Sequence, residues 1–151
     1  MLLIISVAIA IVMPSLSNTA RGRRVGDTAA QLVTLTNYAH NQAISEGKLY
    51  RLNLQPNGSG FWLTMQQDDG QFVELGQEMG QRVDVPEDLR LETDLPRQQD
   101  GGTYVTFRPN GRCEPAPVNF RVSDGMGGVT QITCESSTEL FHIVVNPTNR
   151  R

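Results

Sequence analysis

The pattern of apolar and polar positions changes period along this chain, and each change predicts a different structural element. The stretch from Met1 to Met13 is apolar except for Ser6 and carries no charge. Such a run predicts an apolar helix, but at about 1.5 Å per residue it spans about 20 Å, less than the roughly 30 Å of a bilayer core. A secretory signal peptide would need basic residues before the run, and none is present. We therefore interpret residues 1–24 as an apolar stem helix, for a membrane or a filament, that lacks its start.

Proline and arginine positions add detail to the stem helix. Pro14 lies inside it, and a proline within a helix removes a backbone hydrogen bond, so we expect a kink or a local break there. Arg21, Arg23 and Arg24 follow the apolar run. By the positive-inside rule these arginines would place the C-terminal side in the cytoplasm, and a basic leader before Met1 would restore the opposite orientation.

A second helical pattern begins at Val25, where apolar positions recur every three or four residues up to Gly47. This period predicts an amphipathic helix over residues 25–47 with one apolar stripe. Gly47 stands just after the last periodic residue, a usual place for a glycine that ends a helix. Several members of the stripe are small, so we expect close packing on it. The residues that we assign to helix packing and assembly are Pro14, Val25, Ala29, Leu32, Ala39 and Ala43.

After the helix the apolar period shortens to two, which is the period of a strand. Tyr50, Leu52 and Leu54 share one face of the first such segment. The turn-forming residues 56–60 follow, and further alternating segments and turns continue along the chain. We therefore predict an α+β fold in which a long N-terminal α-helix, the apolar stem included, packs on an antiparallel β-rich domain formed by residues 48–151.

Charge narrows the range of partners. The chain of 151 residues has a formal net charge of −3, which gives no general attraction to nucleic acid or to an anionic membrane. Ten acidic residues and three arginines lie between Asp68 and Asp100, and such a bias is typical of a solvated, loop-rich face. Arg150 and Arg151 end the chain as a small basic patch, which is the candidate for weak, salt-sensitive contact with DNA phosphates.

Two cysteines lie in the β-rich part of the chain. If that part lies outside the cytoplasm, Cys113 and Cys134 are expected to form a disulfide. A chain-entropy argument gives such a disulfide a stabilising contribution of roughly 3 kcal/mol. The alternative is that the two residues are buried free thiols.

We find no arrangement of residues that predicts catalysis or a cofactor. The sequence has no Gly-x-Ser-x-Gly motif and no spacing of serine, histidine and acid that marks a nucleophile. The acidic residues 68–70 lack the spacing of a calcium loop and predict a hairpin turn. Cys113, Cys134 and His142 are soft ligands without the Cys-x-x-Cys spacing of a zinc site. The sequence therefore predicts a structural protein rather than an enzyme, with no metal and no cofactor.

The junction between the helix and the first strand contains a family motif. Its positions are Leu35, Ala39, His40, Ala43, Ile44, Gly47, Tyr50 and Leu52. The motif resembles the L-x-x-A-R-x-x-A-I-x-x-G-x-x-V-x-L signature of type IV pilin-like proteins of the GspH/FimT class, with His40 and Tyr50 in place of the usual arginine and valine. Residues 105–111 are similar to the F-x-P-x-G box of the same class, and the resemblance covers essentially the whole chain.

The resemblance implies both a function and a location. Members of this class that act in type II secretion are minor pseudopilins, held in the inner membrane by a single N-terminal helix with the C-terminal domain in the periplasm. That helix packs with other pseudopilins in a short filament that helps to export folded proteins across the outer membrane. The implied partners are therefore other pseudopilins, the inner membrane and secreted proteins.

The resemblance also implies an alternative function. A FimT-like minor type IV pilin binds DNA through a basic C-terminal tail that carries a Gly-Arg-x-Arg motif. This chain instead ends with residues 147–151, Pro-Thr-Asn-Arg-Arg, so nucleic acid is not the expected partner. The basic leader of the family, its cleavage site and its early glutamate have no counterpart here, so the resemblance does not extend to peptidase processing or N-methylation.

Overall fold

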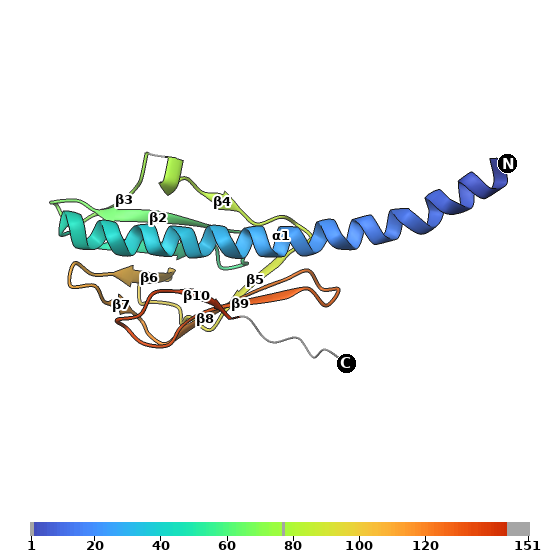
Figure 1. The fold of residues 1–151 in the computed structure, drawn as a ribbon. Helices are drawn as coiled ribbons and strands as arrows, with labels where there is room; N and C mark the ends of the chain where they lie inside the picture. The colour runs from blue at the N-terminus through green and yellow to red at the C-terminus, as the bar shows by residue number, and fades with distance from the viewer. Residues whose placement is uncertain (1, 77, 145–151) are drawn as a thin grey trace.

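The structure is a computed structural model of the 151-residue chain, and it describes residues 2–76 and 78–144. A long helix, α1 (Leu2–Glu46), lies along two antiparallel β-sheets, and its N-terminal part projects beyond them (Figure 1). This arrangement confirms the predicted α+β fold, in which a long N-terminal helix packs on an antiparallel β-sheet domain.

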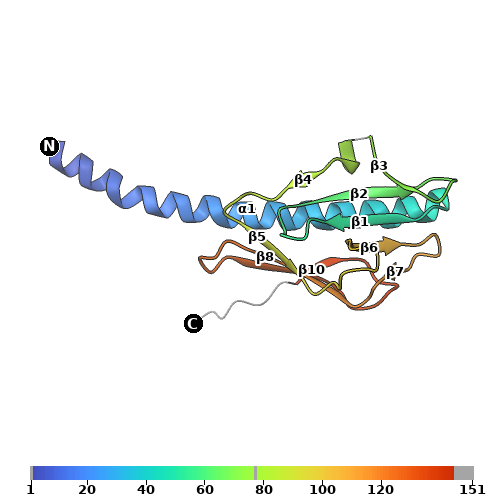
Figure 2. The ribbon, with the colours of Figure 1, turned by 180° about the vertical axis from the view of Figure 1, so that it is seen from behind.

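The stem helix and the amphipathic helix predicted from the sequence form one continuous helix. The local break expected at Pro14 is absent from it, and the helix curves gradually rather than kinking sharply (Figures 1 and 2). A proline removes a single hydrogen bond, and the bonds of the neighbouring turns preserve the helix. The C-terminal end is where the sequence predicts it: Gly47 has a φ of 67° and donates its N–H to the carbonyl of Ala43 at 3.1 Å.

The strands form two sheets. The first sheet has the order β3-β2-β1-β6-β7, with β4 paired to β2 outside that path, and the second has the order β10-β9-β8-β5. The strands of the first sheet are β1 (Tyr50–Leu54), β2 (Gly60–Gln66), β3 (Phe72–Glu74), β4 (Val83–Asp84), β6 (Thr103–Phe107) and β7 (Cys113–Glu114). Those of the second are β5 (Arg90–Thr93), β8 (Val118–Ser123), β9 (Val129–Cys134) and β10 (His142–Val144). A short 3-10 turn, η1 (Glu78–Gly80), precedes β4.

Strand β1 lies at the centre of the first sheet and fixes which side chains point to the core. Leu52 lies opposite Leu63 of β2 and Val105 of β6, and all three are buried. Because side chains alternate along a strand, Arg51 and Asn53 point to the outer face of the same sheet.

The core lies between α1 and the inner faces of both sheets. Phe141, just before β10, packs its ring against Phe107 of the first sheet and Phe120 of the second, with ring centroids 6.1 Å and 5.7 Å apart. Burial of each such ring stabilises the fold by about 1.5–3 kcal/mol, so Phe141 holds the two sheets together. The largest fully buried side chains include Tyr50, Phe61, Phe107, Phe120, Leu32, Leu52, Leu63 and Ile132.

Candidate functional site

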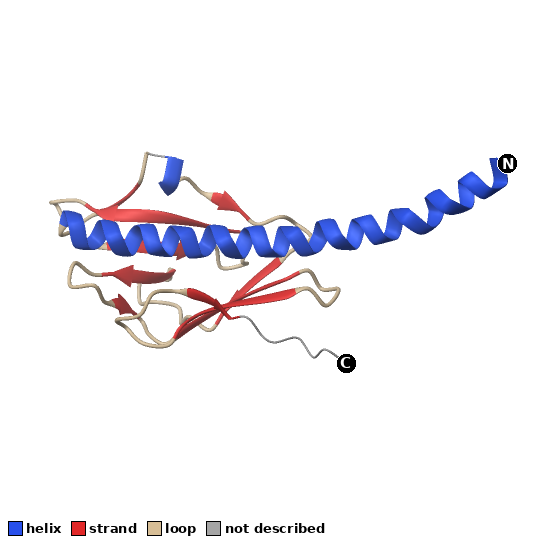
Figure 3. Cartoon of the chain, viewed as in Figure 1, coloured by secondary structure: helices blue, strands red, loops and turns tan. Residues whose placement is uncertain are grey.

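One face of α1 is occupied by the domain of the same chain. The helix α1 lies along both sheets (Figure 3), and its apolar stripe belongs to the core that it shares with them. Its predicted packing residues are each at most 2 % exposed, and they are Val25, Ala29, Leu32, Ala39 and Ala43. Their burial leaves no surface for a neighbouring molecule, so any contact between subunits uses another face of the helix. Pro14, the remaining residue assigned to packing, lies in the same helix.

A row of small residues lies outside the buried stripe of α1. Gly22, Gly26, Ala30 and Thr34 follow one another at four-residue intervals, and all are exposed. A Cβ atom placed on Gly22 or Gly26 would meet no atom within 4 Å. We call these four residues the small-residue ridge. Because residues four apart lie on one side of a helix, the ridge leaves room for another helix to approach closely.

A groove lies beside the small-residue ridge, between α1 and the segment that contains η1 and β4. Its volume is about 520 Å³. The groove is lined by Asp27, Ala30, Gln31, Thr34, Leu35, Met79, Gln81 and Val83. Met79 is 39 % exposed there, so the ridge and the groove together form a partly apolar surface along the helix.

The N-terminal part of α1 extends away from both sheets (Figures 1 and 2). Among the described residues, no helix is at once long enough and apolar enough to cross a membrane.

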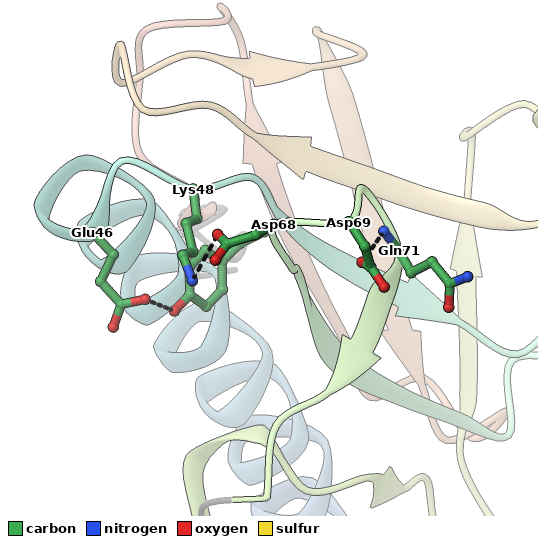
Figure 4. A network of polar contacts seen from close by, with 6 residues as sticks. Glu46, Lys48, Asp68, Asp69 and Gln71 are labelled. Atoms are coloured by element: carbon green, nitrogen blue, oxygen red, sulfur yellow. Dashed lines mark hydrogen bonds and ion pairs between the residues drawn. The ribbon is translucent and has the colours of Figure 1, made fainter.

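The C-terminal end of α1 is tied to the first sheet by polar contacts. The Tyr50 hydroxyl donates a hydrogen bond to Glu46 Oε2 at 2.7 Å, and Lys48 Nζ lies 3.9 Å from Asp68 Oδ1 (Figure 4). Burial of the phenol, with a further contribution from the Glu46 hydrogen bond, raises the pKa of Tyr50 above its usual range. These contacts join the end of α1 to the start of β1, and Lys48 to the turn after β2.

Residues 68–70, two aspartates and a glycine, form the turn between β2 and β3. Asp69 Oδ1 accepts a hydrogen bond from the backbone N–H of Gln71 at 2.9 Å (Figure 4), and Gly70 has a φ of 86°. The hairpin turn predicted here is confirmed, because the aspartate side chain satisfies the backbone of the turn itself. Throughout the described ranges, no group of three or more His, Cys, Asp or Glu side chains is placed to hold a metal ion.

The two cysteines meet between the sheets. Cys113 lies on β7 of the first sheet and Cys134 at the end of β9 of the second, and their Sγ atoms are 3.4 Å apart. Both are buried free cysteines. The predicted disulfide is therefore not formed in this structure, since a bonded pair of sulfurs would be about 2.05 Å apart. The two sulfurs nevertheless face each other, and their pairing stays a prediction.

The environment of the two cysteines raises the pKa of both thiols, so both stay protonated. Burial, together with the hydrogen bond to Cys134, raises the pKa of the Cys113 thiol to about 12. Burial also raises the pKa of Cys134, whose Sγ lies 3.0 Å from the carbonyl oxygen of Ser136. Thiols that stay protonated are poor nucleophiles, so this pair has no features of a reactive cysteine site.

The candidate DNA-contact residues Arg150 and Arg151 lie outside the described residues. The interaction that we inferred for them stays a prediction.

Sequence reasoning missed one cluster on the outer face of the first sheet. The guanidinium carbon of Arg51 lies 3.6 Å from the ring centroid of Phe72 and 4.1 Å from that of Tyr104. The alternation in β1 places Arg51 outward, and this much was available from the sequence. The two aromatic neighbours come from β3 and β6, so only the pairing of strands brings them to the arginine.

A long helix that packs one face on two antiparallel sheets and leaves its N-terminal part projecting is the architecture of pilin-like subunits. Similar solved structures include the minor pseudopilin EpsH from the type 2 secretion system of Vibrio cholerae, with a TM-score of 0.66 and 12 % identity over 80 % of this chain and 96 % of that one. GspH of E. coli has a TM-score of 0.64 and 15 % identity, covering 86 % and 94 %. The type IV minor pilin FimU of Pseudomonas aeruginosa has a TM-score of 0.58 and 16 % identity, covering 83 % and 90 %.

The family follows from the sequence. Residues 28–148 match the model of the family described as type II transport protein GspH, while no curated protein sequence matches the chain. The matched region includes most of the amphipathic helix and nearly all of the β-rich part. This chain therefore belongs to the GspH family, which confirms the resemblance found in the sequence.

Proposed function

We propose that this protein is a minor pseudopilin, a structural subunit of a type II secretion pseudopilus that helps to export folded proteins across the outer membrane. In this proposal the N-terminal part of α1 holds the subunit in the inner membrane and then packs with other pseudopilins, while the β-sheet domain lies in the periplasm. The membership of the GspH family supports the secretion system, and the likeness to EpsH supports the fold of such a subunit.

The observation that carries the proposal is the division of α1 into two faces. The apolar stripe is used within the chain, so the domain fixes the rotation of the helix about its axis. The small-residue ridge stays exposed at the end of α1 that is next to the projecting stem. A subunit that joins a helical filament needs this arrangement, because the helix must be held by its own domain and still accept a neighbouring helix.

The proposal is tested by site-specific cross-linking in the source organism. A photo-reactive amino acid at Ala30, on the small-residue ridge, should cross-link to another pseudopilin of the same system. The matched control is the same amino acid at Gln131, an exposed residue on the second sheet, which should give no such product. Cross-linking at both positions or at neither would contradict the proposed packing face.

Deletion of the gene distinguishes between the two alternative functions, a pseudopilin and a FimT-like minor pilin. For a pseudopilin, deletion should stop the release of exoproteins into the medium, and the full-length gene should restore it. Unchanged secretion together with loss of pilus-dependent DNA uptake would instead favour a FimT-like minor pilin. In that case the purified protein should bind duplex DNA at low salt, and Arg150→Ala with Arg151→Ala should abolish the binding.

A further inference from the structure

The outer face of the first sheet contains an arginine held between two aromatic rings. Arg51 lies on the central strand β1, with Phe72 of β3 on one side and Tyr104 of β6 on the other. Its guanidinium carbon is 3.6 Å and 4.1 Å from the two ring centroids. We call these three residues the Arg51 cage. Stacking on two rings orients the planar guanidinium group before any ligand arrives.

Arg51 forms no ion pair among the described side chains. Its Nε is buried and has no hydrogen-bond partner. Within residues 22–76 and 79–144, whose side chains the structure describes, no carboxylate lies within the 4.0 Å of an ion pair with Arg51. Two carboxylates on this face have other partners: Asp100 accepts from the Tyr104 hydroxyl at 3.2 Å, and Glu114 pairs with Arg108 at 2.8 Å. Glu74 lies on the same face by strand register and forms no ion pair with Arg51. A buried hydrogen-bond donor without a partner lowers the stability of the fold. This distinguishes Arg51 from Asp100 and Glu114, which both have partners.

A second stacked arginine on the same face provides the comparison. Arg82 lies 5.0 Å from the ring centroid of Trp62, and its Nε is 3.5 Å from Asp84 Oδ1. Arg82 therefore has both an aromatic neighbour and a carboxylate. Arg51 has the aromatic neighbours alone, and the carboxylate is the missing partner.

We propose that the Arg51 cage binds a carboxylate of a partner polypeptide, an aspartate or glutamate side chain or a C-terminus, at the centre of an interaction surface on the outer face of the first sheet. A fixed guanidinium fork matches the geometry of a carboxylate. Arginine and aromatic side chains are the residue types enriched at the energetic centres of protein interfaces. The inference goes beyond the proposed function, since it concerns the sheet and not the helix that enters the filament.

The surrounding charge favours a single carboxylate over a polyanion. Glu74, Asp84 and Glu114 lie on the same outer face by strand register, and Asp100 accepts a hydrogen bond from Tyr104 of the cage. A phosphate backbone would bring several negative charges toward these acids, whereas one carboxylate flanked by apolar side chains brings a single charge to Arg51. A polypeptide is therefore the occupant to which the proposal commits.

The test is a titration of the full-length, ¹⁵N-labelled protein in non-ionic detergent micelles, followed by the arginine Nε–Hε resonances in NMR spectra. The probe is the peptide acetyl-Leu-Glu-Leu-amide, with acetyl-Leu-Gln-Leu-amide as the uncharged match. We expect a saturable shift of the Arg51 resonance and about tenfold weaker binding of the glutamine peptide. Equal binding of both peptides, or a shift at Arg51 no larger than at Arg82, would overturn the proposal. Inorganic phosphate binding as tightly as the glutamate peptide would overturn the choice of a polypeptide.

Variants show whether the cage itself is responsible. Arg51→Gln should abolish the response to the glutamate peptide, whereas Arg82→Gln, the matched stacked arginine, should leave it unchanged. If Arg51→Gln fails to fold in a thermal unfolding control, Phe72→Leu removes one ring and keeps the charge, and it should weaken binding several-fold. Unchanged binding in a folded cage variant would show that the peptide binds elsewhere.

Discussion

Cys113 and Cys134 show how the fold brings together residues that lie 21 positions apart. Each belongs to a different sheet, and each is buried. Tyr50 and Glu46 show a local version of the same effect, because the end of the helix and the start of the first strand place the phenol within 2.7 Å of the carboxylate. Both pairs lead to predictions that concern single side chains.

We predict that Cys113 and Cys134 are oxidised to a disulfide in protein isolated from the periplasm. Alkylation after denaturation without reductant should modify no cysteine, because an oxidising compartment favours a disulfide between two sulfurs that the fold holds 3.4 Å apart. A reduced sample, which should show both thiols, is the control. Reduction should lower the free energy of unfolding by roughly 3 kcal/mol. Two modified cysteines in the unreduced sample would refute the pairing.

Tyr50→Phe should lower the free energy of unfolding by about 1 kcal/mol near neutral pH, because it removes the hydrogen bond to Glu46. The pKa of Tyr50 in the folded protein lies above the unfolded value of 10.0. The tyrosine therefore contributes stability that is fully present below that value and is lost as the pH rises above it. Urea unfolding at neutral and alkaline pH measures both effects. An equal alkaline loss of stability in the wild type and the variant would contradict this role of Tyr50.

At the scale of elements, α1 has two faces with different roles. One packs in the core of the domain, and the other is the face that we propose for assembly. Ala39 has no exposed surface and lies on the buried stripe, whereas Ala30 lies on the exposed small-residue ridge. The same substitution at the two positions therefore reports on different functions of the helix. The two sheets pack against the stripe and thereby fix the orientation of the ridge.

We predict that Ala39→Asp destabilises the domain by at least about 3 kcal/mol, because it places an unpaired charge between helix and sheets. Ala30→Asp should change the free energy of unfolding by no more than about 0.5 kcal/mol, since the new side chain reaches solvent. Chemical denaturation of both variants tests the comparison. In cells, Ala30→Asp should still reduce the release of exoproteins. Similar losses of stability in the two variants would refute the assignment of faces.

At the scale of the whole molecule, the projecting part of α1 and the sheet domain are energetically separable. The buried stripe includes Val25, and just before it Arg24 forms an exposed ion pair with Asp88 at 3.2 Å. Such a surface pair contributes about 1 kcal/mol or less. The core of the domain therefore does not depend on the stem.

Residues 25–151 alone should accordingly unfold in a single cooperative transition and should fail to join a pseudopilus. Thermal unfolding followed by circular dichroism tests the first part, and complementation of the deletion strain tests the second. A truncated protein that lacks a cooperative transition would show that the stem contributes to the core. Restored secretion by the truncated protein would show that the stem is not the assembly element.

The sequence by itself determined the elements and their order. Periods of three to four and of two, together with Gly47 and the turn at residues 68–70, are local signals, and local signals act through backbone geometry over a few residues. These signals were sufficient to predict a long helix packed on antiparallel strands. Together with the motif at residues 35–52 they were also sufficient to predict the family. Pro14 shows the limit of such a local signal. The proline removes one backbone hydrogen bond, but the intact turns around it keep α1 continuous.

Only the tertiary structure decided which surfaces are free. The stripe that includes Ala39 and Ala43 is consistent from sequence with packing on a neighbour or on the chain's own sheets, and only burial shows that it is the latter. The Arg51 cage draws Phe72 and Tyr104 from strands on either side of β1. The periodicity of a segment shows which side chains share a face, but the register between distant strands decides which faces meet, because that register is set by packing of the whole core.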